Sequence, residues 1–169
     1  MSIQMIPVTT EDQIDALCKI AEQVWHLTYD PLLPTGQVEY MLEKFQSPYA
    51  VKNQMKNMNY RYYMAVVDGE NAGFIGFSPR YEGREEMFLS KVYLLPGFRG
   101  QGIVREMFGL VEEETRRENL SKIRLTVNKE NTHAVEVYGH YGFYTAEKVV
   151  TDIGNGYVMD DFIMVKELK

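Results

Sequence analysis

The chain has 169 residues, of which 45% are hydrophobic, so it has enough apolar material for the core of one domain. Its formal charge of −6 and its lack of a lysine or arginine block argue against a nucleic-acid-binding protein, whose contact surface concentrates positive charge. A single cysteine, Cys18, excludes an internal disulfide and a cysteine-cluster metal site. We therefore expect one domain that covers residues 1–169.

No apolar run approaches the roughly 20 residues that a membrane-spanning helix needs. The first residues, MSIQMIPVTTEDQ, lack the basic and then apolar pattern of a signal peptide. The sequence therefore predicts a cytoplasmic protein with no membrane partner. The histidines are isolated and offer no spacing typical of a metal site, so no metal is expected.

The first third of the chain is predicted to be mostly helical. A short strand is expected at residues 2–8, and apolar residues then recur at helical spacing in segments 9–29, 35–45 and 47–58. Thr9 and Thr10 supply hydroxyl caps for the first of these helices. Ser47-Pro48 is a similar start signal for the third.

The middle of the chain consists of β-rich runs separated by turns, with strands expected at residues 61–67, 71–77 and 87–95. Asp68-Gly69-Glu70 joins the first two as a hairpin. Gly73 and Gly76 lie inside the second strand, where glycine indicates a β-bulge or the close approach of another backbone.

The last third alternates helices and strands, with a long helix at 101–119, a strand at 122–127, a helix at 131–141 and strands at 143–151 and 157–165. Glu112 with Arg116, and Glu113 with Arg117, have the spacing of ion pairs on an exposed helix face. The order of the elements predicts a mixed α/β sheet in which the fourth and fifth strands are parallel neighbours joined by the long helix.

A glycine loop joins the fourth strand to that helix, within the stretch VYLLPGFRGQGIVREMF at residues 92–108. The first amides of a helix have no internal acceptor, and glycines let an oxygen-rich ligand approach them, so the junction is typical of an anion site. The loop lacks the Gly-Lys-Ser/Thr of an ATP-binding loop, and Arg105 occupies the third glycine position of a dinucleotide fingerprint. The pattern favours another diphosphate ligand, and a glycine-rich turn that binds nothing is the alternative.

The loop RGQGIV, residues 99–104, resembles the acyl-CoA signature Q/R-x-x-G-x-G/A of the GNAT superfamily of N-acetyltransferases, with Val104 where glycine or alanine is usual. Residues 123–143 resemble its second signature, in which Asn131, Ala134, Tyr138, Gly142 and Phe143 stand in order. The resemblance covers residues 60–166 well and the first third loosely. It implies a mostly antiparallel sheet of six to seven strands, with parallel strands 4 and 5 splayed apart and helices on both faces.

The resemblance implies acetyl-CoA as co-substrate. The implied cofactor-binding residues are Val92, Tyr93 and Leu94 for the pantetheine arm, Arg99, Gly100, Gln101, Gly102, Ile103 and Val104 for the diphosphate, and Asn131 for a hydrogen bond to the arm. A backbone N–H near Leu94 would point at the thioester oxygen. Tyr138 stands at the general-acid position, and a phenol of pKa about 10 is a suitable proton donor to a thiolate of pKa about 8.5.

The acceptor amine must lose a proton, since a group of pKa about 10.4 is almost wholly charged near pH 7. A glutamate on the fourth strand serves as base in some family members, and Glu86 is the candidate here, with Glu82 and Glu85 nearby. Asp160 and Asp161 in the last strand are candidates to steer a cationic substrate. A solvated pair on an edge strand is the alternative for at least one of them.

In the family, the first helical region folds over the acceptor. The implied substrate-binding residues are His26 and Tyr29, and Trp25, Gln37 and Tyr40 are further lining residues. Packing in the core is the alternative for the aromatic side chains, and we favour it for Trp25.

The resemblance therefore implies an acetyltransferase that moves an acetyl group to a primary amine by direct transfer in a ternary complex. The acceptor is a small amine, a polyamine-like metabolite or a peptide amine, and the acidity of the chain favours a polyamine. The alternatives are a non-catalytic acyl-CoA-binding or sensing module and an aminoglycoside-type antibiotic acetyltransferase. Val104 favours the sensor, whereas Tyr138 opposes it. The oligomeric state stays open, with a homodimer among the options.

Overall fold

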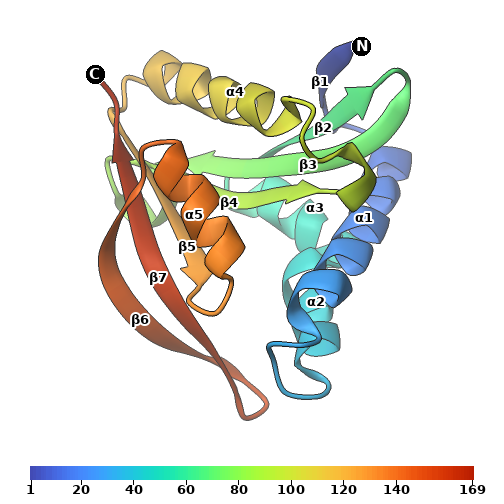
Figure 1. Ribbon diagram of the computed structural model, residues 1–169, viewed down its shortest axis with the longest axis vertical. Coiled ribbons are helices and arrows are strands. Elements are labelled where there is room, and N and C mark those ends of the chain that lie inside the picture. The colour runs from blue at the N-terminus through green and yellow to red at the C-terminus, as the bar shows by residue number, and fades with distance from the viewer.

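A seven-stranded sheet runs through the computed structural model, which describes residues 1–169 (Figure 1). Its strands are β1 (Ile3–Pro7), β2 (Arg61–Val67), β3 (Glu70–Pro79), β4 (Met87–Leu94), β5 (Lys122–Asn128), β6 (Tyr144–Gly154) and β7 (Tyr157–Glu167). They are ordered β1-β2-β3-β4-β5-β7-β6. Only the β4–β5 pair is parallel, and this confirms the predicted mixed sheet.

Helices cover both faces of the sheet (Figure 1). They are α1 (Glu11–Tyr29), α2 (Gln37–Gln46), α3 (Pro48–Asn57), α4 (Ile103–Arg117) and α5 (Thr132–His140), with 3-10 turns at Tyr81–Gly83 and Pro96–Phe98. Apolar residues of α4 form one core with the sheet, and α5 packs against it. The residues of α1 to α3 form a second core on the other face. None of the helices combines the length and the apolar character that crossing a bilayer requires.

Some elements differ in length from the expectation. Helix α4 starts at Ile103 rather than at residue 101, because Gly100 and Gly102 have φ values of +76° and +80°, outside the helical region. Strands β6 and β7 form a longer hairpin than predicted and extend to Gly154 and Glu167. Strand β7 lies between β5 and β6, so it is not the edge strand that was considered for its two aspartates.

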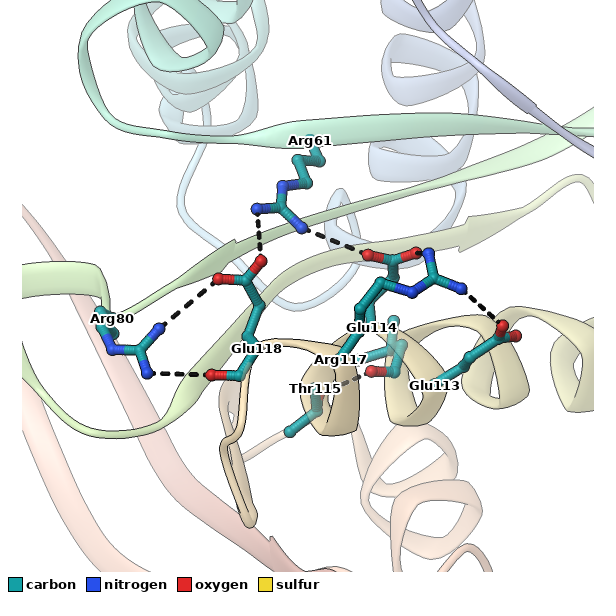
Figure 2. Close-up of polar contacts among 8 residues, drawn as sticks. Arg61, Arg80, Glu113, Glu114, Thr115, Arg117 and Glu118 are labelled. Carbon is teal, nitrogen blue, oxygen red and sulfur yellow. Dashed lines mark hydrogen bonds and ion pairs between the residues drawn. The ribbon is translucent and has the colours of Figure 1, made fainter.

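Ion pairs join the end of α4 to strand β2 and to Arg80, the residue that follows strand β3, as Figure 2 shows. The Glu114 carboxylate is buried and accepts hydrogen bonds from Arg61 at 3.2 Å and from Arg117 at 2.6 Å. Arg61 also donates to Glu118 at 3.0 Å, and Arg80 donates to the Glu118 backbone carbonyl at 2.9 Å. The guanidinium groups of Arg61 and Arg117 compensate the buried charge of Glu114. Arg61, on β2, also fixes the helix against the sheet.

Only one of the two predicted pairs on the exposed face of α4 forms. Arg117 donates to Glu113 at 2.8 Å, which confirms that pair (Figure 2). The expected pair of Glu112 with Arg116 is wrong, because Glu112 binds Lys166 of β7 instead. The sequence spacing indicated Arg116 on the same helix as the partner of Glu112, whereas in the folded protein Lys166 of β7 is closer.

We expect Glu114→Ala to lower the free energy of unfolding by about 2–3 kcal/mol, because it leaves two arginines without their shared buried partner. Glu113→Ala is the matched control on the same helix. Its exposed ion pair is expected to contribute less than about 1 kcal/mol. Urea denaturation of both variants measures the difference. Equal losses would contradict the role given to Glu114.

Both glycines of β3 lie where a side chain would clash. A Cβ atom at Gly73 would stand 2.2 Å from the carbonyl oxygen of Tyr93, and one at Gly76 would stand 2.5 Å from the Tyr62 ring. The register shifts next to Gly76, which lies opposite Lys91 while Phe77 lies opposite Leu89. The predicted close approach and bulge are both confirmed.

The bulge adds one residue, Ser90, to strand β4. A bulge places two successive side chains on one face of a sheet. Accordingly, Ser90 accepts a hydrogen bond from Tyr60 at 2.9 Å, while the Lys91 ammonium lies 5.9 Å from the centre of the Trp25 ring. The two polar side chains therefore lie side by side on the face that α1 to α3 cover.

Candidate active site

Strands β4 and β5 separate after a short contact. They pair only at Met87 with Ile123 and at Phe88 with Arg124, so the edge of β4 beyond Phe88 has no strand partner on this side. A cavity of about 1470 Å³ opens here and is lined by β4, β5, α5 and the helices of the first third. The splayed parallel pair predicted from the sequence is thus confirmed, and it leaves room for an extended ligand beside β4.

The glycine loop at the end of β4 presents free backbone amides. No hydrogen bond within the chain is donated by the amides of residues 100–105. A Cβ atom at Gly100 or Gly102 would meet nothing within 4 Å, so the backbone there is open. Arg99, Gly100 and Val104 line the cavity. The loop therefore has the donors, the positive charge and the space that a diphosphate requires.

The remaining loop side chains have structural roles. Ile103 is buried in the core beneath α4, and Gln101 donates to the carbonyl of Gly97 at 3.4 Å. Val104 packs against the same core, yet its amide has no acceptor within the chain. The valine thus does not remove the donor that the usual glycine or alanine would offer.

Tyr138 lies on α5 and lines the cavity. Its ring packs against Phe108 at 5.9 Å and Phe143 at 5.8 Å between ring centres. Burial, together with the nearby Tyr29, raises the pKa of the Tyr138 phenol above its ordinary value. The hydroxyl therefore stays protonated at neutral pH, which suits a proton donor.

Asn131 and Tyr29 meet across the cavity. Asn131 donates to the Tyr29 hydroxyl at 3.3 Å and accepts from the amide of Ala134 at 3.3 Å, so it caps α5 and holds α1. Tyr93 lies beside them, with its ring 5.9 Å from that of Trp25. Trp25 is in the core, as favoured from the sequence, and it also lines the cavity.

Asp161 of β7 is a buried carboxylate on the wall of the cavity. Burial raises the pKa of Asp161 to about 6, and the nearby charge of Asp160 adds to the effect. Asp160 is more exposed and forms an ion pair with Lys129. Only one of the two aspartates is therefore solvated, and the other could accept a proton near neutral pH.

Several residues predicted for the acceptor side, among them Tyr40, His26 and Glu86, do not line the cavity. Tyr40 donates to the carbonyl of Ile153 at 2.6 Å. His26 turns away toward Asp30 at 2.9 Å and has Glu39 at 4.0 Å. Glu86 precedes β4 and lies in a small separate pocket, where Arg84 and Arg124 are 3.9 and 3.6 Å from its carboxylate. Their side chains follow local partners that the sequence pattern did not reveal.

Two lysines that no sequence motif indicated also line the cavity, Lys44 of α2 and Lys91 of β4. Neither lysine belongs to a motif, so local sequence carries no signal for them. Lys91 in particular follows from the bulge at Ser90, which only the register of β3 and β4 defines.

A family model for the acetyltransferase (GNAT) family matches residues 21–143 of the sequence. No curated protein matches it significantly. Among solved structures, the PaiA N-acetyltransferase of Thermoplasma acidophilum, in complex with coenzyme A, is similar with a TM-score of 0.80 and 20% identity over 99% of each chain. A ribosomal-protein-alanine N-acetyltransferase from Brucella melitensis has a TM-score of 0.67 and 21% identity over 99% of this chain and 100% of that one. A spermidine N-acetyltransferase SpeG chimera from Vibrio cholerae and hSSAT has a TM-score of 0.69 and 16% identity over 99% and 96%.

Proposed function

Because the chain belongs to the acetyltransferase (GNAT) family, we propose that it transfers the acetyl group of acetyl-CoA to the primary amine of a small molecule or a peptide. Transfer is direct, in a ternary complex. The observation that carries the proposal is the run of unbonded amides at residues 100–105, at the mouth of the cleft that β4 and β5 leave open. The cleft also contains a protonated phenol and a buried carboxylate, the two groups that acyl transfer to an amine needs.

Acetyl-CoA supplies the acetyl thioester. The amides of residues 100–105 and the guanidinium of Arg99 hold its diphosphate, and the free edge of β4 at residues 92–94 pairs with its pantetheine arm. Asn131 donates a hydrogen bond to the arm. A backbone N–H near Leu94 stabilises the charge that develops on the thioester oxygen.

Asp161 takes the place of Glu86 as the base, because it lines the cavity and Glu86 faces two arginines outside it. Asp161 accepts a proton from the acceptor ammonium, directly or through a water molecule, so that the nitrogen can attack the thioester carbon. Tyr138 donates its phenolic proton to the sulfur as the carbon–sulfur bond breaks, and the second proton that the nitrogen loses on forming the amide restores the Tyr138 phenol.

The test has two stages. Calorimetric titration with acetyl-CoA checks the cofactor site, and a thiol-release assay over amino acids, polyamines, aminoglycosides and peptides then identifies the acceptor. We expect binding and thiol release with at least one amine. A failure to bind acetyl-CoA would refute the proposal, and binding without turnover of any amine would favour the non-catalytic sensor.

A further inference from the structure

Lys91 is a buried ammonium without a partner. Its side chain is 9% exposed and lines the cavity. It makes no hydrogen bond or ion pair within the chain. Its ammonium has only cation–π contacts, with the centres of the Trp25 ring at 5.9 Å and the Phe45 ring at 5.8 Å. Burial lowers the pKa of Lys91 to about 8, and at pH 7 the group is still mainly charged. A buried charge of this kind is unfavourable unless something neutralises it.

Lys44 brings a second positive charge to the same place. Its ammonium lies 5.6 Å from the Phe45 ring, the ring that Lys91 also approaches, and it donates to the carbonyl of Ile153 at 2.6 Å. Neither lysine forms an ion pair within 4.0 Å, although Asp161, Glu82 and Glu136 also line the cavity. Two cations therefore flank the Phe45 ring: Lys91, which is buried and unpaired, and Lys44, which is exposed and bonded to a carbonyl.

We propose that the acceptor carries a carboxylate beside its amine, and that Lys91 binds this carboxylate with help from Lys44. The proposal rests on the acetyltransferase function given above and names the substrate class, an amino acid or a similar zwitterion. The charges of the cavity complement such a molecule, since Asp161 on β7 attracts the ammonium while Lys91 on β4 attracts the carboxylate.

A polyamine fits this wall less well. A second ammonium that approached this wall would meet the buried, unpaired charge of Lys91, and like charges with little water between them repel. The acidity of the whole chain favoured a polyamine, but the net charge of a protein does not describe the charge around one pocket.

The experiment compares amino acids with their carboxamides and with the amines that lack the carboxyl group. We expect the wild-type protein to prefer the carboxylate by about 30-fold in kcat/KM, since a hydrogen-bonded charge pair in a buried site discriminates by one to two orders of magnitude. Lys91→Met should abolish the preference by raising KM for the carboxylate about 30-fold, with kcat and the carboxamide kinetics changed less than threefold. Lys44→Met, at an exposed lysine, should raise the same KM about threefold.

Product analogues provide a readout that does not depend on turnover. The CoA-loaded protein is titrated by calorimetry with an N-acetyl amino acid and with its carboxamide. The wild type should bind the carboxylate, and the Lys91→Met variant should lose this binding. If the wild type binds acetyl-CoA but acetylates no amine, the acetyltransferase proposal fails, and this titration still tests the carboxylate site.

Three results would overturn the inference: equal wild-type kinetics for acids and carboxamides, a preference for diamines, or a Lys91→Met variant whose kcat falls equally for every acceptor. The last would make Lys91 a base or a structural residue. Circular dichroism and acetyl-CoA affinity confirm that the variant is folded.

Discussion

Tyr138→Phe is expected to lower kcat by about 10²-fold or more while leaving the affinity for acetyl-CoA within about twofold of the wild type. The phenylalanine keeps the packing against Phe108 and Phe143 but has no proton to give to the departing sulfur. Because burial holds the Tyr138 phenol in its protonated form, the variant loses a general acid and not a general base.

Tyr141→Phe is the control for this experiment. Tyr141 lies one turn further along the chain, lines the same cavity and packs against Phe108 at 4.6 Å. Its replacement should change kcat less than about threefold. Thiol release at saturating substrates measures both variants, and a Tyr138→Phe enzyme as fast as the wild type would remove the tyrosine from the mechanism.

Asp161→Asn is expected to lower kcat/KM by about 10²-fold and at the same time to stabilise the protein. The wild-type kcat/KM should rise with pH through about 6 as Asp161 ionises, and the variant should lose this dependence. Asp160→Asn, at the solvated neighbour that pairs with Lys129, should keep the rate at neutral pH nearly unchanged. Its pH profile should move slightly toward lower pH, because the charge of Asp160 contributes to the raised pKa of Asp161.

The stability change follows from the direction of the pKa shift. Burial raises the pKa of Asp161 from 3.8 to about 6, so the folded protein binds this proton more tightly than the unfolded chain does. The corresponding stability is fully present below pH 3.8 and is lost as the pH rises through 6. Removing the buried charge should therefore raise the free energy of unfolding by about 2 kcal/mol at pH 7 and by little at pH 3.5.

Urea denaturation at pH 7 and pH 3.5 tests the predicted change in the stability of the Asp161→Asn variant. A variant that is less stable than the wild type at pH 7 would mean that the Asp161 carboxylate has a compensating partner in the folded protein. A slower but more stable enzyme would instead show that the charge is kept for the reaction.

The geometry of the glycine loop and of the α5 cap could be predicted because their signals are local. Gly100 and Gly102 mark a loop before an amphipathic helix, and Asn131 has the sequence context of a helix cap. Each feature depends on residues within one or two turns of the chain. The splayed β4–β5 pair follows from the order of elements and from the family resemblance, and the register confirms it.

The acceptor half depends on contacts between distant segments, and local patterns did not reach it. The family resemblance implied His26 as a lining residue, yet its ring faces Asp30 and Glu39 instead. In the sequence, Asp161 is one of two adjacent aspartates that a solvated edge strand would explain. The structure places β7 between β5 and β6, so β7 is not an edge strand. Lys91 faces the cavity in a stretch of β4 where the alternation is broken.

The bulge also affects how this family member could diverge. Leu89 lies opposite Phe77 and Lys91 lies opposite Gly76, so the ladder is regular on either side of Ser90. Without Ser90, the side chains of β4 would alternate regularly between the two faces of the sheet. Lys91 would keep its present face, and the loop that follows would keep its position. A single-codon insertion or deletion at this position can thus add or remove a polar group on the cavity wall, while the position of the glycine loop is kept.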